Sequence, residues 1–535
     1  MNHATFYSSK YPTAKNFLAD KNGTLPTTPI NYEATPNALA PTNYYGTRLN
    51  DKDQIHVSLP INFFVAHGIS VSVQPYYEVS DFTINSISRL REGYTYSGNQ
   101  LQEVDLNGDG KISSKTYQNV SMPARSINKQ GGVIASIVWK EGHNELEAGY
   151  WHESSSYTLQ TAPTKLLSQS TLATPADTDM SYNYTTLQGN PYYSVNYTGN
   201  YNLDSGFFRD TYHLFNDAMS LEAAIKLVSD NLSGVSYLPG SGGRVNRNFF
   251  APMPHFSWSW QIAKAHQLYI NAEGDFRAPG STNLISRYSA TTGKISISGG
   301  NPKPQYAIKE ELGYRYSGGI FLVDISLFNF NISNRLLSLD TYVDGQEASQ
   351  QVNTGGETIR GVDVMFATRP IFHRFSPYIS FEYLHARLDN NIPSTTVDGV
   401  TDYLRTSGKT PISTPKINGS IGITYNEGAF FLNASIHYTG KQYSTFMNDE
   451  SLHGYFSDNL AVGYHIPKFG VVKSSTFRIN ASNLTGQYSR NGNYSTGTNA
   501  RATTGVYGHM IASSGSPTYV IMPAFSLMGT YSADF

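Results

Sequence analysis

The chain has 535 residues, with 38 Lys and Arg against 40 Asp and Glu, a formal net charge of −2 and no cysteine. This balance gives no basic excess for nucleic-acid binding, and the lack of cysteine excludes disulfides, thiolate metal sites and a cysteine nucleophile. Charged residues make up only 15% of the chain, while 39 Tyr and 46 Gly are present. Such a composition is typical of many strands with aromatic side chains at an interface.

The first 53 residues are polar and rich in Asn, Thr, Pro and Tyr, without a lasting period. We expect residues 1–53 to form an extended N-terminal arm or loop. Their start has no apolar core of the kind that a signal peptide contains. No apolar run anywhere in the chain reaches the roughly 18 residues that a transmembrane helix needs.

A clear alternation of apolar and polar residues begins at Gln54. Every second residue from Ile55 to Phe63 is apolar, and the pattern returns from Ile69 after a short turn at Gly68. Because successive side chains of a strand point to opposite faces, both segments are predicted to be amphipathic strands. Each has about ten residues, the length of a tilted strand that crosses a membrane.

The same pattern predicts about seventeen strands in all. The further ones lie at 131–140, 145–153, 206–216, 219–229, 249–262, 266–276, 306–317, 319–332, 357–368, 375–388, 415–425, 429–439, 455–466, 475–484 and in the terminal stretch 519–535. In the terminal stretch, one face carries Phe525, Leu527, Tyr531 and Phe535. We expect this stretch to be the closing strand of a barrel, because an unpaired edge would otherwise be exposed.

Short turns alternate with long polar segments at 84–129, 159–204, 277–305, 389–413 and 485–518. Compact soluble domains rarely contain such loops, whereas outer-membrane barrels have short periplasmic turns and long outward loops. The fold class predicted for residues 54–535 is therefore all-β, a transmembrane antiparallel β-barrel. A large soluble β-sandwich or β-helix is the alternative.

Several segments in the second half resemble those of one family. They are Phe276-Arg277-Ala278-Pro279, Asn301-Pro302 followed by Glu310 to Tyr316, Asn353-Thr354-Gly355 followed by Ile359 to Val364, Gly408 to Lys416, and Ile479 to Tyr488. Their order over 276–535 resembles that of the TonB-dependent outer-membrane receptors, with Asp363 where a Glu is usual. The terminal Phe535 matches the residue that the barrel assembly machinery reads in that class.

This resemblance implies a Gram-negative outer-membrane transport protein that is not an enzyme and has no cofactor. Its ligand would be a scarce nutrient, most often a metal chelate such as a ferric siderophore, and its surroundings outer-membrane lipid. The family barrel has about 22 strands around a plug, so we expect an N-terminally truncated receptor that couples to TonB only through a missing N-terminal part. The alternatives are a passive porin-like or surface-binding barrel, and a secreted soluble β-protein.

One loop resembles the first part of a calcium-binding loop. The sequence DLNGDGKIS places oxygen-bearing side chains at positions 1, 3 and 5 and a glycine at position 6, which suits a hard cation. Position 12 is Thr116, so the usual bidentate acid is missing. The candidate ligands for a weak calcium site are Asp105, Asn107, Asp109, Lys111 and Ser113. The alternative is a turn-rich loop without an ion.

No catalytic constellation is present in the sequence. His437 and His465 lie on polar strand faces, where a structural role is expected. Four cations, Arg277, Lys303, Arg315 and Arg335, are candidates to attract an anionic ferric chelate, although ordinary lumen charge is the favoured interpretation. We expect an interfacial aromatic girdle formed by Tyr76, Tyr150, Trp151, Trp258, Tyr314, Tyr438, Tyr464 and Tyr531.

Overall fold

The computed structural model describes most of the chain. The described residues are 2–7, 49–85, 87–165, 179–241, 243–280, 284–297, 302–343, 346–372, 374–397, 400–468 and 470–534. Most of the predicted arm, Asn301 and Phe535 therefore lie outside the described residues. No helix among the described residues is long and apolar enough to cross a membrane.

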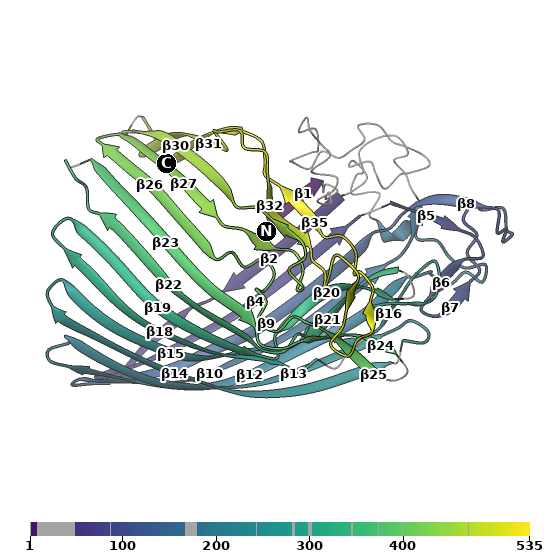
Figure 1. Ribbon diagram of the computed structural model, residues 1–535, viewed down its shortest axis with the longest axis horizontal. Helices are drawn as coiled ribbons and strands as arrows, with labels where there is room; N and C mark the ends of the chain where they lie inside the picture. Colours follow the sequence, from purple (N-terminus) through teal and green to yellow (C-terminus); the bar gives the residue numbers. More distant parts are fainter. Residues whose placement is uncertain are drawn as a thin grey trace.

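One large antiparallel sheet of 19 strands dominates the molecule (Figure 1). Its strands are β1 (Asn2–Tyr7), β2 (Leu49–Ser58), β3 (Ile61–Ala66), β4 (Ile69–Ile84), β9 (Ala124–Glu141), β10 (Asn144–Thr161), β12 (Val195–Leu214), β13 (Met219–Ser236), β14 (Arg244–Ala263), β15 (His266–Arg277), β18 (Gln305–Gly318), β19 (Phe321–Ser333), β22 (Glu357–Thr368), β23 (Phe375–Leu388), β26 (Ile417–Glu427), β27 (Phe430–Thr439), β30 (Tyr455–Ile466), β31 (Ser474–Ser482) and β36 (Ser526–Asp534). The all-β antiparallel prediction is confirmed.

Neighbours in the sheet are neighbours in the chain, with one exception at the start. Both β2 and β3 pair with β4, because the strand is interrupted at Leu59-Pro60. Pro60 has no N–H to donate to the ladder. The Leu59 N–H just before it still bonds to the Pro75 carbonyl at 3.0 Å, so the chain stays beside β4 across the interruption. β1 lies within the segment that we expected to be an arm, and it pairs with β2.

The two ends of the sheet differ in their connections. Short turns join the strands at one end, while smaller hairpins extend from the other (Figure 1). In the turn between β3 and β4, Gly68 has φ +73°, and a Cβ there would lie 2.2 Å from the Lys140 carbonyl oxygen. Only glycine fits this turn without strain.

The long loops contain secondary structure of their own. It comprises β5 (Ile87–Arg91), β6 (Thr95–Ser97), β7 (Gln100–Gln102), β8 (Tyr117–Ser121), β11 (Thr164–Lys165), the 3-10 helix η4 (Met180–Tyr182), β16 (Arg287–Tyr288), β17 (Ile295–Ile297), β20 (Leu336–Val343), β21 (Gln346–Asn353), β24 (Ile392–Val397), β25 (Val400–Leu404), β28 (Gln442–Tyr443), β29 (Ser451–Leu452), β32 (Arg490–Ser495), β33 (Thr503–Thr504), β34 (Met510–Ile511) and β35 (Thr518–Ile521). The buried clusters lie here, one of them formed by Leu90, Val104, Leu106, Val120, Tyr184 and Tyr192.

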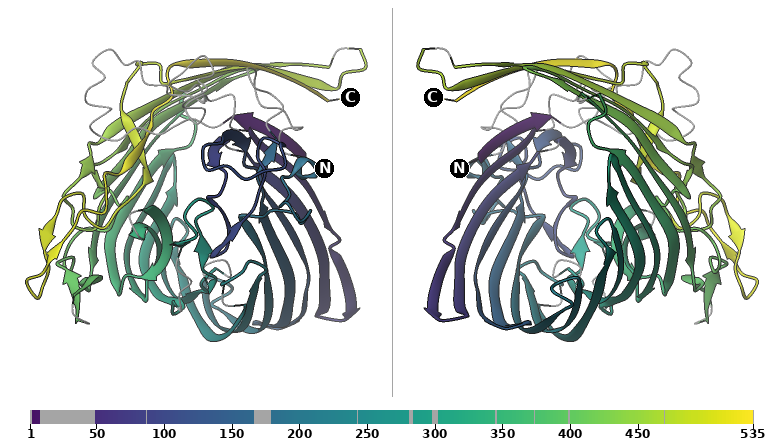
Figure 2. Two further views of the ribbon diagram at one scale, coloured as in Figure 1. Left: turned by 90° about the vertical axis from the view of Figure 1, so that its right-hand side faces the viewer. Right: turned by 90° about the vertical axis from the view of Figure 1, so that its left-hand side faces the viewer.

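The terminal stretch is not one strand, which corrects our prediction. Tyr519 belongs to β35, which pairs with β32 in a loop, and the last barrel strand begins only at Ser526. Pro523 lies in the irregular segment between them. Within the described residues β36 pairs with β31 alone and β1 with β2 alone, so no pairing closes the sheet there. Figure 2 shows the sheet curling around a central space, with both chain ends on one side.

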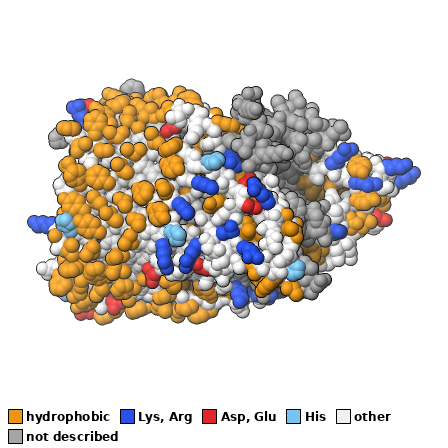
Figure 3. Space-filling model, in the orientation of Figure 1, with side chains coloured by type: hydrophobic (Ala, Val, Ile, Leu, Met, Phe, Trp, Pro, Cys, Tyr) orange, Lys and Arg blue, Asp and Glu red, His pale blue; other side chains and the backbone are white. Residues whose placement is uncertain are grey.

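Alternation sorts the side chains of the sheet onto two faces. On β27, Phe430, Ile436 and Tyr438 lie on the face opposite to Ser435 and His437, as the sequence predicted. The first face is the outer one: Ile436 is 48% exposed, and apolar side chains cover the outside of the sheet over its short-turn half (Figure 3). The second face lines the lumen and is polar, which is the arrangement of a membrane barrel.

Candidate ligand-binding lumen

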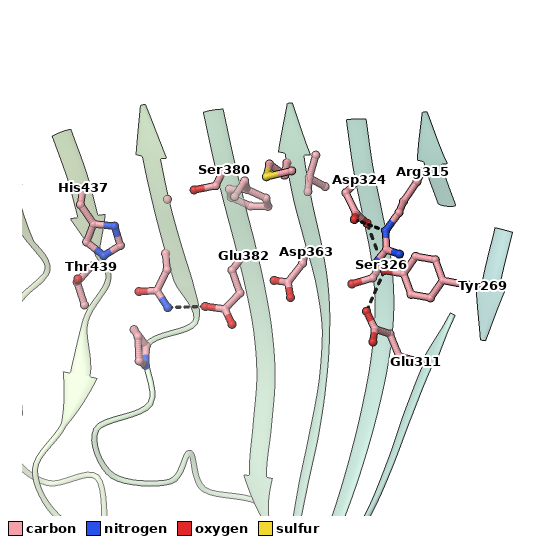
Figure 4. Close-up of a pocket in the computed structure, with 16 residues that line it drawn as sticks. Tyr269, Glu311, Arg315, Asp324, Ser326, Asp363, Ser380, Glu382, His437 and Thr439 are labelled. Carbon is pink, nitrogen blue, oxygen red and sulfur yellow. Dashed lines mark hydrogen bonds and ion pairs between the residues drawn. The ribbon is translucent and has the colours of Figure 1, made fainter. Parts of the chain in front are cut away.

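A recess of about 700 Å³ lies on the lumen face of seven neighbouring strands, from β15 to β27. Pairing registers bring its residues together, since Tyr269 lies opposite Gly313, Arg315 opposite Asp324, and Asp363 opposite Glu382. All of these side chains have the parity that points inward. Figure 4 shows them along the wall.

This wall is acidic. Four carboxylates, from Glu311, Asp324, Asp363 and Glu382, face a single guanidinium, that of Arg315. Arg315 pairs with Asp324 at 2.7 Å, and its guanidinium stacks over the Tyr269 ring at 4.1 Å. The wall therefore keeps an excess of negative charge that favours cationic groups in the lumen.

Hydrogen bonds hold the carboxylates in place. The Tyr269 hydroxyl lies 3.0 Å from Glu311 Oε1 and 3.2 Å from Asp324 Oδ1, and the Asn418 amide donates to Glu382 at 2.6 Å. Tyr269 is only 5% exposed. The single hydroxyl proton of this buried phenol lies between the two carboxylates, so Tyr269 links Glu311 to Asp324. Glu311 and Asp363 were recognised in the sequence as parts of the family motifs, but the cluster was not predicted.

A second recess, of about 460 Å³, lies on the lumen face of β9 to β14. Trp151 lines it and donates from Nε1 to the Tyr76 hydroxyl at 2.9 Å, while Lys226 lies 4.6 Å over the Trp151 ring. Tyr76 in turn donates to Glu153, which also accepts from Gln130.

This network corrects the predicted aromatic girdle. Tyr76 and Trp151 face the lumen, whereas Tyr150, the neighbour of Trp151, faces outward because adjacent side chains alternate. By the same parity, the outward-facing members of the predicted girdle are Tyr150, Trp258, Tyr314, Tyr438, Tyr464 and Tyr531.

The predicted calcium loop lies between β7 and β8, outside the barrel strands that line both recesses. Both oxygens of Asp105 accept backbone N–H groups, from Gly108 and Gly110, at 2.6 Å. Asn107 and Asp109 accept from the backbone two residues on. Desolvation raises the pKa of Asp105, but the backbone N–H groups of the loop outweigh it and lower the pKa. Calcium binding by Asp105, Asn107, Asp109, Lys111 and Ser113 stays a prediction.

A buried acid that the sequence did not point to supports this loop. Glu92 has no exposed surface. Its Oε1 accepts from the backbone of Leu106 at 2.9 Å and Asn107 at 3.3 Å, and its Oε2 from Ser113 at 2.8 Å. Glu92 thus joins the start and the end of the DLNGDGKIS segment.

Two of the predicted cations and both histidines have ordinary partners. Besides Arg315, Arg335 pairs with the buried Glu357 at 3.2 Å. Arg277 is exposed at the loop end of β15, and Lys303 is exposed just before β18 begins at Gln305. His437 and His465 lie beside hydroxyls, Ser420 at 2.7 Å and Thr476 at 2.9 Å. Within the described part of the chain, no group of three or more His, Asp or Glu is placed to hold a metal ion.

A second acid missed by the sequence ties two loops together. Asp402 in β25 is fully buried and accepts backbone N–H groups from Tyr507 at 2.8 Å and His509 at 2.9 Å. Burial raises the pKa of Asp402, but N–H groups from Tyr507, Tyr403 and His509 outweigh this and bring it to about 2. The loops beyond β23 and β31 thereby form one connected surface.

Known proteins share this architecture. A family model described as TonB dependent receptor-like, beta-barrel, matches residues 3–484. Similar solved structures include the ferric preacinetobactin receptor BauA from Acinetobacter baumannii (16% identity, TM-score 0.55, 95% of this chain and 66% of that one). The siderophore receptor PiuA from the same organism is 11% identical, with a TM-score of 0.61, and the match covers 99% of this chain and 71% of PiuA. The ferric yersiniabactin uptake receptor FyuA from Yersinia pestis is 14% identical, with a TM-score of 0.57, and the match covers 91% of this chain and 62% of FyuA.

At these identities the structural matches show the fold alone. The chain spans about two thirds of the length of the solved receptors that it matches.

Proposed function

Because the chain belongs to the TonB-dependent receptor β-barrel family, we propose that it is the barrel part of an outer-membrane transport protein for a scarce nutrient. The observation that carries this proposal is the division of the sheet into an apolar outer face and a polar lumen face. The apolar outer face suits contact with lipid, and the polar lumen face suits an aqueous or plugged interior. Transport rather than catalysis is the proposed activity.

The ligand that we propose is a ferric siderophore. BauA, PiuA and FyuA are by name receptors for ligands of this kind. A ferric chelate with negative charge would avoid the acidic lumen wall and contact the loop end of the barrel, where Arg277 is exposed. The acidic wall itself suits cationic side chains of a plug, the segment that the family resemblance implies.

The partners follow from the same proposal. Energy would come through TonB by way of a plug-bearing N-terminal part, and insertion would use the barrel assembly machinery. The aromatic Phe535 is the proposed recognition residue for that machinery. These partners rest on the family resemblance, and the polar lumen supports them by offering a path for a ligand.

Ligand binding tests the proposal on the longest receptor polypeptide that contains this chain. Intrinsic fluorescence would be titrated with ferric siderophores, their iron-free forms and cobalamin. We expect quenching by a ferric form and not by its iron-free form, and a roughly tenfold weaker affinity in Arg277→Ala, about 1.4 kcal/mol. Lys264→Ala is the matched control, because Lys264 is exposed in the turn at the other end of β15.

Each outcome bears on one part of the proposal. Quenching by cobalamin alone would keep transport and overturn the siderophore. A receptor that binds none of these ligands would favour a passive barrel instead.

A further inference from the structure

The second recess, on the lumen face of β9 to β14, contains a lysine whose charge has no acidic partner. The Lys226 ammonium lies 4.6 Å from the centre of the Trp151 ring, and among the described residues it forms no ion pair. The two acids on its own face of β13, Glu222 and Asp230, are each four residues away, about 13 Å along the strand. Because a partly buried charge is costly without a partner of opposite sign, this side of the recess can accept an anion.

The other cationic groups that line the recess are already paired. Arg209 lies 2.7 Å from Glu147. The same guanidinium is 3.5 Å from Glu145 and 3.7 Å from Glu222. His255 lies 3.3 Å from Glu222. Lys226 is therefore the described cation of this recess that stays available to a ligand.

The walls beside Lys226 are apolar and fixed in position. Lys226 lies directly between Phe207 on β12 and Met253 on β14 in the pairing registers. The Phe207 ring occupies the space over Gly149, where a Cβ would lie 2.2 Å from the ring. Trp151 is held by its bond to the Tyr76 hydroxyl. A planar ring fits such walls, since both aromatic rings and a thioether make favourable contacts with it.

We propose that this recess binds a planar aromatic carboxylate. The carboxylate lies at the Lys226 ammonium, and the ring packs against Phe207 and Met253. The volume of about 460 Å³ falls within the range of roughly 300–1,000 Å³ for small-molecule sites, which combine apolar walls with a few placed polar groups. A small inorganic anion would leave the apolar walls unused, and a neutral ring would leave Lys226 unpaired. The site goes beyond the proposed function, because it is built from the barrel wall and not from the loop end.

Equilibrium dialysis of the 535-residue chain in detergent tests this site, with protein-free micelles as the blank. The probes are naphthoate and its neutral amide, naphthamide. We expect saturable binding of naphthoate, and binding about tenfold weaker for naphthamide and for naphthoate in Lys226→Met. Lys309→Met is the matched control, because Lys309 also faces the lumen but pairs with Glu273 at 3.2 Å and Asp275 at 2.9 Å.

Two more variants separate charge from ring contact. Lys226→Arg keeps the positive charge, so we expect it to bind naphthoate far better than Lys226→Met does. Phe207→Leu removes the ring, so we expect it to weaken naphthoate and naphthamide alike. Equal binding of the two probes by the wild-type protein would overturn the proposal, even if Lys226→Met failed to fold. Naphthoate binding that Lys226→Met leaves unchanged would overturn it too.

Arg277→Ala separates this site from the proposed function. We expect that variant to bind naphthoate normally, although it should bind a ferric siderophore less tightly. Naphthoate binding without any siderophore binding would refute the siderophore alone, and the reverse result would refute the recess alone. Naphthoate binding that disappears in the longest receptor polypeptide containing this chain would show that another segment fills the recess, and would also overturn the ligand site.

Discussion

At the scale of single residues, two buried carboxylates organise the loops. Glu92 and Asp402 both accept several backbone N–H groups that would otherwise be buried without partners. Such groups are costly to leave unpaired, so each acid fixes the shape of a segment remote in sequence. The sequence pointed to the neighbouring DLNGDGKIS motif but not to Glu92, because nothing local marks a residue whose partners are 14 to 21 positions away.

Replacing Glu92 by alanine should open the loop unit without unfolding the barrel. Three backbone N–H groups would lose their acceptor, at a cost of about 1–3 kcal/mol for a buried group. Limited proteolysis should then cut within 105–116 faster than in the wild-type protein. Glu103→Gln is the control, because Glu103 is exposed in the same unit and bonds to Gln188. An unchanged cleavage rate in Glu92→Ala would contradict the role of this acid.

Calcium binding by the same loop can be measured by calorimetry. With no acid at position 12, we expect a dissociation constant of about 1 mM, at the weak end of the known range. Asp105→Ala should abolish the heat. If the wild-type protein gives no heat with millimolar calcium, the loop binds no calcium and its shape comes from the hydrogen bonds of its own acids and of Glu92.

Acid should release the contact between Asp402 and the 505–509 segment. Its folded-state pKa of about 2 lies below the ordinary value of 3.8, so its contribution is present above about pH 4 and is lost as pH falls toward 2. Hydrogen exchange at Tyr507 and His509 should rise over that window, and Asp402→Asn should raise it at neutral pH. Asp389→Asn is the control, because Asp389 lies in the same loop but accepts from Thr358 instead, and it should leave this exchange unchanged. If Asp402→Asn does not raise the exchange at Tyr507 and His509, the proposed contact is refuted.

At the scale of elements, alternation predicted the barrel strands where lipid lies outside. The strand predicted at 429–439 matches β27, Phe430–Thr439. It ended too early on β12, which begins at Val195 rather than near 206, although Tyr197, Tyr201 and Leu203 continue the alternation there. The acidic wall also escaped prediction, because its members come from different strands and meet only through the registers.

A charge on the outer face should harm folding far more than one on the lumen face. Ile436→Arg would place a guanidinium against lipid near mid-depth, at a cost of about 2–4 kcal/mol. Ser435→Arg, one residue away, points into the lumen and should cost little. Urea titration of the barrel in liposomes, followed by heat-modifiable mobility on gels, gives both values. Equal costs would mean that the two faces are wrongly assigned.

At the scale of the whole molecule, the chain combines an apolar outer face, an acidic lumen wall and an organised loop surface. The loops contact one another through buried groups such as Tyr519, which bonds to Ser444 at 3.0 Å and Glu450 at 2.7 Å. The loop surface is therefore built from loops that are far apart in sequence. Under the proposed function, the outer face would anchor this surface in lipid and the lumen would be the route of the ligand.

Energy-dependent uptake tests the central claim most directly. Cells that express the full coding sequence containing this chain would be supplied with radioactive iron as ferric siderophores, with and without a working TonB. The account predicts saturable uptake of a ferric chelate that disappears without TonB. Uptake that is non-saturable and continues unchanged without TonB would contradict it and identify a passive pore.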